Sequence, residues 1–545
     1  MIRRPALGLR SLPAPTLPAE LASAKALALH IDHRGPRRRQ ALRERLGTII
    51  TTLGGDTRPD HSSVELLEQV EAVLAKSDQD GMWLALAVIA GRLPDDATVI
   101  SAFRRSRLDG PLAALAHTII VPRIPRSREA LAARSSAESR WPEVRVETDA
   151  VLVDLHHTSL TELATGIQRV ARQTAQRWAR DHEIVPVGWS SDMAALRRLT
   201  PDETAQALGT GTGPDENAVR IEDELVIPWR ATYLLPELIT EPDRLRALQG
   251  ILHFSGSRSG VIGFDCVPIT SAETVGDGMG GAFSRMLATV AYSDRIATIS
   301  DAAAREYSGW RQMLSGAGLA GPQIQAVALA AEAPTATDAS LAACAKLLDA
   351  GDSPIVLCVG SHEPRKNHLA VLQAAEIVWR RGVDFTLVFV GGNAWRSERF
   401  SERVEELQEA GRPVKLLRAL SDEVLGAAYT LAACVIFPSL NEGFGLPVAE
   451  ALAAGTPVIT SNFGSMREIA GGGGALLVDP RADDEIAVAL NDLLTDQALK
   501  ARLITEAQAF NVRSWDGYAA ACWQYFVADS SVPERTKASV EPTCQ

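Results

Sequence analysis

The chain has 545 residues, more than one hydrophobic core usually organises, so two or three domains are expected. Its content of 46% hydrophobic and 22% charged residues is ordinary for a globular protein and excludes a wholly disordered chain. The net charge of −12, without a basic stripe interleaved with aromatic residues, argues against binding of nucleic acid.

The first 50 residues are basic, with nine Arg and one Lys against three acidic residues. A solvated, weakly ordered N-terminus is the commoner form of such a segment, and contact with acidic lipid or a partner is the alternative. No apolar run approaches the roughly 18–20 residues of a membrane-spanning helix, and the charged start lacks the apolar core of a signal peptide. We therefore predict a cytoplasmic protein, with peripheral contact at the inner face of the membrane through the basic arm as the alternative.

Residues 1–145 are predicted to form a helical N-terminal extension. Two segments, 62–77 and 81–93, carry apolar residues at three-and-four spacing and are separated by polar breaks. Asp78 and Asp80 resemble a metal-binding carboxylate pair, but their polar surroundings favour a turn.

From Val151 onward, short β-branched runs alternate with helical stretches, which indicates two parallel, doubly wound α/β sheets. The strand-poor segment Ser315–Pro354 separates them and is interpreted as a linker that contains a helix. The expected strands lie at 151–155, 183–187, 232–236, 260–265 and 294–300, then at 354–360, 384–391, 413–417, 434–439 and 457–461.

The most informative segment runs from Phe437 to Pro480. A buried strand leads to the glycine-containing loop 441–445, Pro447 suits the first turn of the next helix, and Gly455 suits its end. Free backbone N–H groups, the positive end of a helix dipole and glycines that allow close approach together fit a diphosphate.

Two carboxylates accompany this loop, Glu442 within it and Glu450 on the helix. A carboxylate on such a helix can accept both hydroxyl groups of a ribose, as in dinucleotide-binding folds, and the loop carboxylate would then face a sugar. Alternatively, Glu442 caps the helix and Glu450 lies on a solvated face. The joint pattern of strand, glycine loop and second Glu favours the binding site.

A second segment places cations at the end of a parallel strand. The strand 354–360 ends in Gly360, and the following loop contains Arg365 and Lys366. Ligands of such folds bind at the carboxyl ends of the strands, where these cations could neutralise a leaving diphosphate. An Arg-Lys pair taken alone is more often a surface pair.

No metal or cofactor is predicted. The six cysteines are scattered without a Cys-x-x-Cys pair, which indicates reduced thiols and a cytosolic setting. The motif segment has neither an Asp-x-Asp pair nor a histidine cluster.

These motifs resemble those of glycosyltransferase family 4. The resemblance rests on V-G-S-H-E-P-R-K-N-H at 359–368 and E-G-F-G-L-P-V-x-E at 442–450. In the first half, T-G-I-Q-R-V at 165–170, F-D-C-V-P-I at 264–269 and I-A-T-I-S at 296–300 are similar to elements of bacterial polysaccharide members. The resemblance covers about residues 150–525 and is most specific between 355 and 480.

The resemblance implies a GT-B fold, in which two Rossmann-like domains face a cleft. It implies an acceptor domain at 146–335, a donor domain at 336–515 and a helix at 516–526 that crosses back to the acceptor domain. The helical extension at 1–145, which the resemblance does not reach, and a disordered tail at 527–545 are predicted from the sequence pattern alone. The implied activity is retaining transfer of a hexose from a nucleotide-diphosphate sugar to a glycan or lipid-linked acceptor, in surface polysaccharide synthesis.

The resemblance also implies roles for individual residues. Arg365 and Lys366 would hold the diphosphate, Glu450 the ribose, and Glu442 the donor sugar together with Asp265. The further donor-binding residues would be Gly443, Phe444, Gly445, Leu446, Gly360, Asn367, Gly166 and, at the base, Leu420. Two positions depart from the family pattern, because Ser361 replaces an arginine and Phe264 replaces a histidine.

Two kinds of alternative remain open at this point. One is another enzyme on the same fold, a sugar-nucleotide epimerase or a glycan phosphorylase. The other is a non-catalytic scaffold that retains the donor fold. For a transferase, we favour front-face departure of the diphosphate over a covalent intermediate. A covalent intermediate would need a well-placed nucleophile, and the motifs give only weak support for Glu442 in that role.

Overall fold

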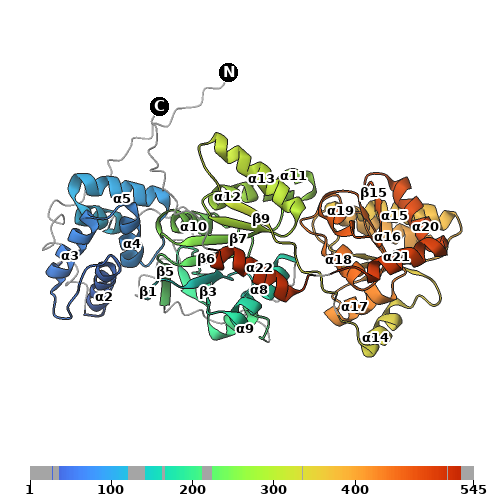
Figure 1. Ribbon diagram of the computed structural model, residues 1–545, viewed down its shortest axis with the longest axis horizontal. Coiled ribbons are helices and arrows are strands. Elements are labelled where there is room, and N and C mark those ends of the chain that lie inside the picture. Colours follow the sequence, from blue (N-terminus) through green and yellow to red (C-terminus); the bar gives the residue numbers. More distant parts are fainter. Residues whose placement is uncertain are drawn as a thin grey trace, which may run out of the picture.

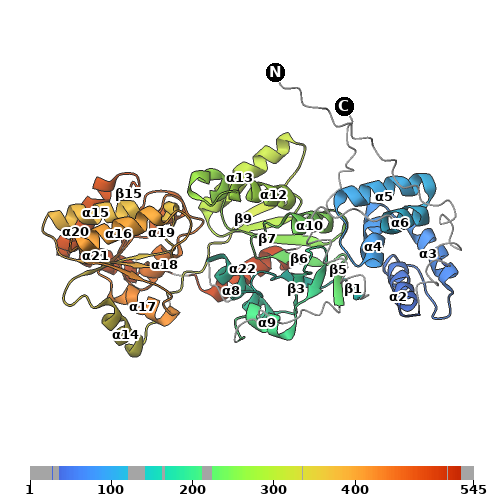
Figure 2. The ribbon, with the colours of Figure 1, turned by 180° about the vertical axis from the view of Figure 1, so that it is seen from behind.

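The structure is a computed structural model that describes residues 28, 36–120, 142–161, 166–211, 224–333, 335–511 and 513–529. Three regions follow one another along its long axis: a group of helices, a nine-stranded sheet and a six-stranded sheet (Figure 1). The view from behind shows the same order (Figure 2). The predictions for the first part of the basic arm, for Thr165 and for most of the C-terminal tail lie outside the described residues.

The first region is helical, as its apolar spacing indicates. It consists of α2 (Pro36–Thr52), α3 (Ser63–Ala75), α4 (Gln79–Ala90), α5 (Asp96–Asp109) and α6 (Pro111–Ile120). Ser62 and Glu65 form a capping box that starts α3, and the side chain of Asp78 caps α4 by accepting from the backbone N–H of Asp80. The Asp78–Asp80 pair therefore starts a helix.

Part of the basic segment is built into this region, so the expectation of a solvated N-terminus is wrong for residues 36–52. The Arg45 guanidinium is buried and donates to the backbone carbonyls of Ile89 and Pro142. Satisfying two buried carbonyls fixes α2 against α4 and against the start of the sheet.

The helical region shares its hydrophobic core with the first sheet. Trp83 on α4 stacks on Trp229 with ring centroids 6.5 Å apart, and both side chains are buried. A Cβ atom at Gly250 would lie 2.3 Å from the carbonyl oxygen of Pro94, so glycine permits this close approach. The first sheet begins at Glu143, so its first strand spans the predicted boundary at residue 145.

The first sheet has the strand order β1-β5-β4-β3-β2-β6-β7-β8-β9. Its strands are β1 (Glu143–Glu147), β2 (Val151–Asp154), β3 (Val185–Trp189), β4 (Leu196–Arg198), β5 (Glu224–Pro228), β6 (Thr232–Leu235), β7 (Arg258–Gly263), β8 (Arg295–Thr298) and β9 (Gln323–Ala326). All described pairings are parallel except those of β4, because β3 and β4 form a hairpin. β9 lies inside the segment that was interpreted as a linker.

The helices of this domain connect and cover these strands. They are α8 (Gly166–Asp181), α9 (Pro201–Ala207), α10 (Pro242–Phe254), α11 (Val267–Thr270), η2 (Ala272–Thr274), α12 (Met279–Val290) and α13 (Asp301–Gly316). α8 is the next described helix after β2, and α13 begins three residues after the end of β8. Arg169 on α8 and Asp301 at the start of α13 contact the second sheet domain.

The second sheet is entirely parallel in its described strands, with the order β12-β11-β10-β13-β14-β15. These strands are β10 (Ile355–Val359), β11 (Thr386–Val390), β12 (Val414–Leu417), β13 (Cys434–Phe437), β14 (Val458–Ser461) and β15 (Ala475–Val478). The helices are α14 (Asp338–Leu348), η3 (Pro364–Lys366), α15 (His368–Arg380), α16 (Glu398–Glu409), α17 (Asp422–Leu431), α18 (Leu446–Ala453), α19 (Gly464–Ala470), α20 (Asp483–Thr495) and α21 (Gln497–Gln508). The two sheet domains form the predicted GT-B fold.

After α21 the chain returns to the first sheet domain as α22 (Trp515–Trp523) and the π-helix η4 (Gln524–Ala528) (Figure 1). The indole N–H of Trp178 on α8 donates to the carbonyl of Ala519 at 2.9 Å. Arg177 Nε, also on α8, lies 2.5 Å from Asp516 Oδ1. Residues 515–528 are thereby packed on the first sheet domain.

Within the described part of the chain, every helix is too short or too polar to cross a bilayer.

Candidate active site

The glycine loop between β13 and α18 lies where the second sheet faces the first domain. Gly445 precedes the helix with φ of 100°, a left-handed conformation that glycine adopts without strain, and Pro447 lies in the first turn. No side chain caps α18 among the residues described, so the alternative that Glu442 is a helix cap is wrong.

Glu442 is mostly buried, with its side chain 9% exposed, and pairs with the two predicted cations. Its Oε1 lies 2.7 Å from Lys366 Nζ, its Oε2 lies 2.6 Å from Arg365 Nη1, and Ser439 Oγ donates to Oε1 at 2.7 Å. Burial alone would raise the pKa of this carboxyl, but Arg365 and Lys366 lower it to about 2. Glu442 is therefore ionised at neutral pH.

Arg365 and Lys366 are mostly buried, with side chains 16% and 11% exposed, so the surface-pair alternative is wrong. Arg365 also contacts Glu363 at 2.5 Å and donates to the carbonyl of Asn441. Burial disfavours the charged guanidinium, but the neighbouring carboxylates raise the pKa of Arg365. Lys366 lies 4.8 Å from the ring centroid of Phe437, a cation–π contact.

The loop that carries these cations is fixed by backbone contacts. Asn367 has a φ of 59°, and its amide nitrogen donates to the carbonyls of Pro438 and Pro480. A Cβ atom at Gly360 would meet the side chain of Lys366 at 3.5 Å. Gly360 and Asn367 thus shape the loop from β10, while their predicted contact with a donor stays a prediction.

Glu450 on α18 is also buried, so its assignment to a solvated face is wrong. Tyr429 on α17 donates its hydroxyl to Oε2 at 2.9 Å, and Arg169 on α8 donates Nη1 to Oε1 at 2.6 Å. Burial raises the pKa of Glu450, and the Arg169 guanidinium opposes that shift. Arg169 comes from the opposite sheet domain and was not among the predicted site residues.

The loop also contacts the predicted residues of the first domain. A Cβ atom at Gly443 would lie 2.7 Å from the carbonyl oxygen of Phe264 and 2.8 Å from Asp265 Oδ2. Ser300 Oγ donates to the Gly443 carbonyl at 2.6 Å, and Asn441 Nδ2 donates to Thr270 Oγ1 at 3.2 Å. The structure thereby brings the F-D-C-V-P-I and I-A-T-I-S elements against the glycine loop.

Asp265 is partly buried beside this loop. Burial raises its pKa to about 6, although Arg365 and the backbone N–H of Val267 favour the ionised form. Asp265 therefore changes charge close to neutral pH, whereas Glu442 does not.

The other predicted donor-binding residues, Phe444, Leu446, Gly166 and Leu420, lie in different surroundings. Phe444 is buried in a hydrophobic cluster with Phe264, so any donor contact by Phe444 falls to its backbone. Leu446 and Gly166 meet across the domain interface, where a Cβ atom at Gly166 would lie 3.9 Å from Leu446 Cδ1. Leu420 is partly buried just before α17.

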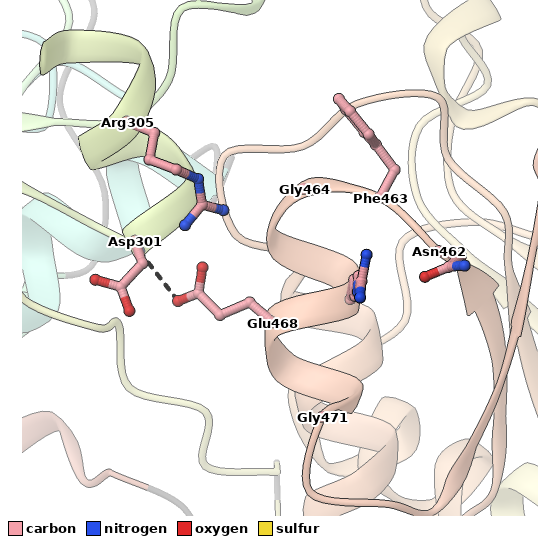
Figure 3. A pocket seen from close by; sticks show the side chains of 8 residues that line it. Asp301, Arg305, Asn462, Phe463, Gly464, Glu468 and Gly471 are labelled. Atoms are coloured by element: carbon pink, nitrogen blue, oxygen red, sulfur yellow. Dashed lines mark hydrogen bonds between the residues drawn. The ribbon is translucent and has the colours of Figure 1, made fainter. Parts of the chain in front are cut away.

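A pocket of about 470 Å³ lies beside the glycine loop, between α13 and α19. Its lining residues are Asp301, Arg305, Asn462, Phe463, Gly464, Arg467, Glu468 and Gly471. Figure 3 shows Glu468 directed at the start of α13, where its carboxylate accepts from the backbone N–H of Asp301 at 3.0 Å. None of the predicted site residues lines this pocket.

Residues 343–510 match the family described as glycosyl transferases group 1. This matched domain contains Arg365, Lys366, Glu442 and Glu450, all at the carboxyl edge of the second sheet or just beyond it. Asp265, Gly166 and Arg169 belong to the first sheet domain and lie outside the match.

Curated relatives extend the similarity into the first sheet domain. The serotype-specific mannosyltransferase WbdA of Escherichia coli is 29% identical over 345 residues, which are 59% of this chain and 40% of the relative. The O-antigen chain mannosyltransferase B of Escherichia coli is 33% identical over 165 residues, 29% of this chain and 42% of the relative. The matched part of this chain thus spans about 40% of the length of these relatives.

Solved structures show the same fold. Anabaena HepE, solved in complex with UDP and glucose, superposes with a TM-score of 0.50 at 12% identity, covering 70% of this chain and 99% of that one. The N-terminal domain of Candida albicans trehalose-6-phosphate phosphatase also gives 0.50 at 12% identity, with 70% and 97% coverage. At this identity the likeness concerns the fold alone.

In the described part of the chain, no three His, Cys, Asp or Glu side chains converge closely enough to hold a metal ion. Five cysteines are free and buried there, at Cys266, Cys344, Cys358, Cys434 and Cys522. Metal-independent chemistry and a cytosolic setting stay predictions.

Proposed function

We propose that the protein is a retaining glycosyltransferase that moves a hexose from a nucleoside-diphosphate sugar to a glycan or lipid-linked acceptor in surface polysaccharide synthesis. The observation that carries this proposal is the buried cluster of Arg365, Lys366 and Glu442, which faces Asp265 across the domain interface. The names of the relatives, both mannosyltransferases, favour mannose as the hexose.

The charges of the cluster suit departure of a diphosphate. In the proposed reaction, the bond between the anomeric carbon and the diphosphate oxygen breaks, and the acceptor hydroxyl attacks from the same face. Its proton passes to the leaving diphosphate. Arg365 and Lys366 would stabilise the negative charge that grows on the phosphate oxygens, and the ionised Glu442 would stabilise the positive sugar. No metal ion takes part in this proposal.

Replacing Glu450 with Gln tests the donor site. We expect the wild type to release nucleoside diphosphate from one member of a panel: GDP-mannose, UDP-glucose, UDP-N-acetylglucosamine, UDP-galactose and dTDP-rhamnose. Loss of the charged partner of a ribose should raise the donor KM by about 10- to 100-fold. Glu376→Gln is the matched control, because Glu376 on α15 of the same domain pairs with Arg380 and Arg412, neither of them a predicted site residue.

The alternatives give different outcomes in the same assay. An epimerase would convert the donor sugar without releasing nucleotide, and a phosphorylase would need inorganic phosphate to cleave a glycan. A scaffold would leave every donor intact with glycan acceptors present. Any of these results would contradict the proposal.

We expect the ionisation of Asp265 to set how turnover depends on pH. Because its pKa is about 6, the carboxyl becomes negatively charged as the pH rises past 6, and a negative charge beside the donor sugar favours a positive transition state. We expect kcat of the wild type to rise through this pH, and kcat of Asp265→Asn to be low and flat there. A rise of the same size in both proteins would rule out Asp265 as its source.

A further inference from the structure

We propose that Arg169 sets the affinity for the donor by competing with the donor ribose for Glu450. This inference rests on the proposed function, because it takes Glu450 as the ribose acceptor. It adds a residue outside the matched domain, contributed by α8 of the opposite sheet domain.

Both oxygens of Glu450 are already used in this structure. Tyr429 donates to Oε2 from α17 and Arg169 donates to Oε1 from α8, and the Glu450 side chain is only 4% exposed. Tyr429 is completely buried, whereas the Arg169 side chain is 22% exposed. The accessible side of the carboxylate is therefore the side that Arg169 covers.

A ribose would need that same side. Two vicinal hydroxyl groups bind a carboxylate by donating to its oxygens, so they require the position that the guanidinium holds at 2.6 Å from Oε1. The buried Tyr429 cannot make room for them without losing its own partner. Arg169 is the partner that can leave, since its head lies at the boundary between the domains.

The ion pair lowers the apparent affinity for the donor. When a binding site is free for only a fraction of the time, the apparent dissociation constant rises by the inverse of that fraction. Burial raises the pKa of Glu450 and Arg169 opposes this shift, so the intact ion pair favours the ionised carboxylate. Each donor that binds would also break the ion pair between Arg169 and Glu450, which joins α8 to α18.

The test uses Arg169→Gln, which removes the charge but keeps a polar side chain. Arg177→Gln is the matched control, because Arg177 lies two turns further along α8 and pairs with Asp516 on α22. Binding of UDP, GDP, uridine and guanosine is measured by titration calorimetry with the full-length proteins. All titrations are run at pH 8, because burial raises the pKa of Glu450 and removal of the guanidinium takes away a group that opposes this shift.

For the base that the wild type binds, we expect Arg169→Gln to bind the nucleoside and its diphosphate about tenfold more tightly, the effect of removing one charged hydrogen-bonded competitor. Arg177→Gln should match the wild type. Adding Arg169→Gln to Glu450→Gln should give no further gain, because the contested carboxylate is then absent.

Equal or weaker binding by Arg169→Gln would overturn the inference and show that Arg169 supports the site. If Arg169→Gln does not fold, as judged by circular dichroism and thermal melting, Arg169→Lys replaces it, because a single ammonium makes a weaker, less directional pair than the guanidinium. Tighter binding by Arg169→Lys supports the inference, and unchanged or weaker binding overturns it. If the folded wild type binds none of the four probes and releases no nucleoside diphosphate from the donor panel, the proposed function itself fails and the inference falls with it. Turnover of dTDP-rhamnose without binding of the four probes would keep the proposed function and overturn the inference, because a deoxyribose lacks the two vicinal hydroxyl groups.

Discussion

Replacing Arg365 with Met is expected to reduce kcat by a factor of about 100 to 1000, the usual cost of removing one preorganised charge from a developing anion. The guanidinium is held by Glu442, Glu363 and the carbonyl of Asn441, so it is fixed before any substrate binds. Single-turnover measurement of nucleoside diphosphate release separates this loss from a change in donor KM.

The same substitution should also lower stability, because the buried Glu442 would retain only Lys366 and Ser439. Leaving a buried carboxylate short of a partner costs about 3–5 kcal/mol in the strongest cases. Arg403→Met is the control, since Arg403 pairs with Glu406 on the exposed face of α16. A stable Arg365→Met protein with wild-type kcat would exclude Arg365 from the reaction.

Adding a methyl group at Gly443 is expected to abolish most activity while changing the melting temperature little. The new Cβ would lie 2.7 Å from a backbone carbonyl of the other domain, at Phe264, and a backbone atom cannot rotate away. The loop with Glu442 must then shift, and a displacement of about 1 Å can cost roughly 100-fold in rate.

Gly472→Ala is the matched control for this substitution, because a Cβ there meets nothing within 4 Å. Rate and melting temperature are measured for both variants. Wild-type activity in Gly443→Ala would mean that the contact with Phe264 is dispensable for turnover. A large drop in melting temperature would instead indicate that the loop supports the fold.

The sequence predicts the two-sheet architecture well because buried parallel strands are short, β-branched and separated by helices. The runs at 151–155 and 354–360 became β2 and β10 for this reason. The strand β1 was missed because its sequence, EVRVE, alternates charge with valine at the edge of a sheet. β4, with only three residues, has too little pattern to recognise.

The individual site residues were easier to predict than their partners. Arg365, Lys366 and Glu442 follow from strand ends and glycine positions, but their mutual contacts depend on how two loops fold together. Arg169 is separated from Glu450 by 281 positions and by a domain boundary. The sequence does show a cation here, because Arg169 lies about one helical turn after Gly166 in T-G-I-Q-R-V. The sequence alone does not indicate which residue this cation pairs with.

The edge strand β1 has a bearing on how the protein behaves at high concentration. An open strand at a sheet edge is a template for pairing with another molecule, and charged side chains or a covering helix oppose such pairing. β1 exposes Glu143 and Arg145, and Arg145 Nε lies 3.0 Å from Oε1 of the buried Glu147. Arg45 of α2 donates to the carbonyl of Pro142 just before the strand. The helices at the start of the chain therefore protect this sheet against intermolecular strand addition, and a chain shortened to begin at β1 would be prone to aggregate.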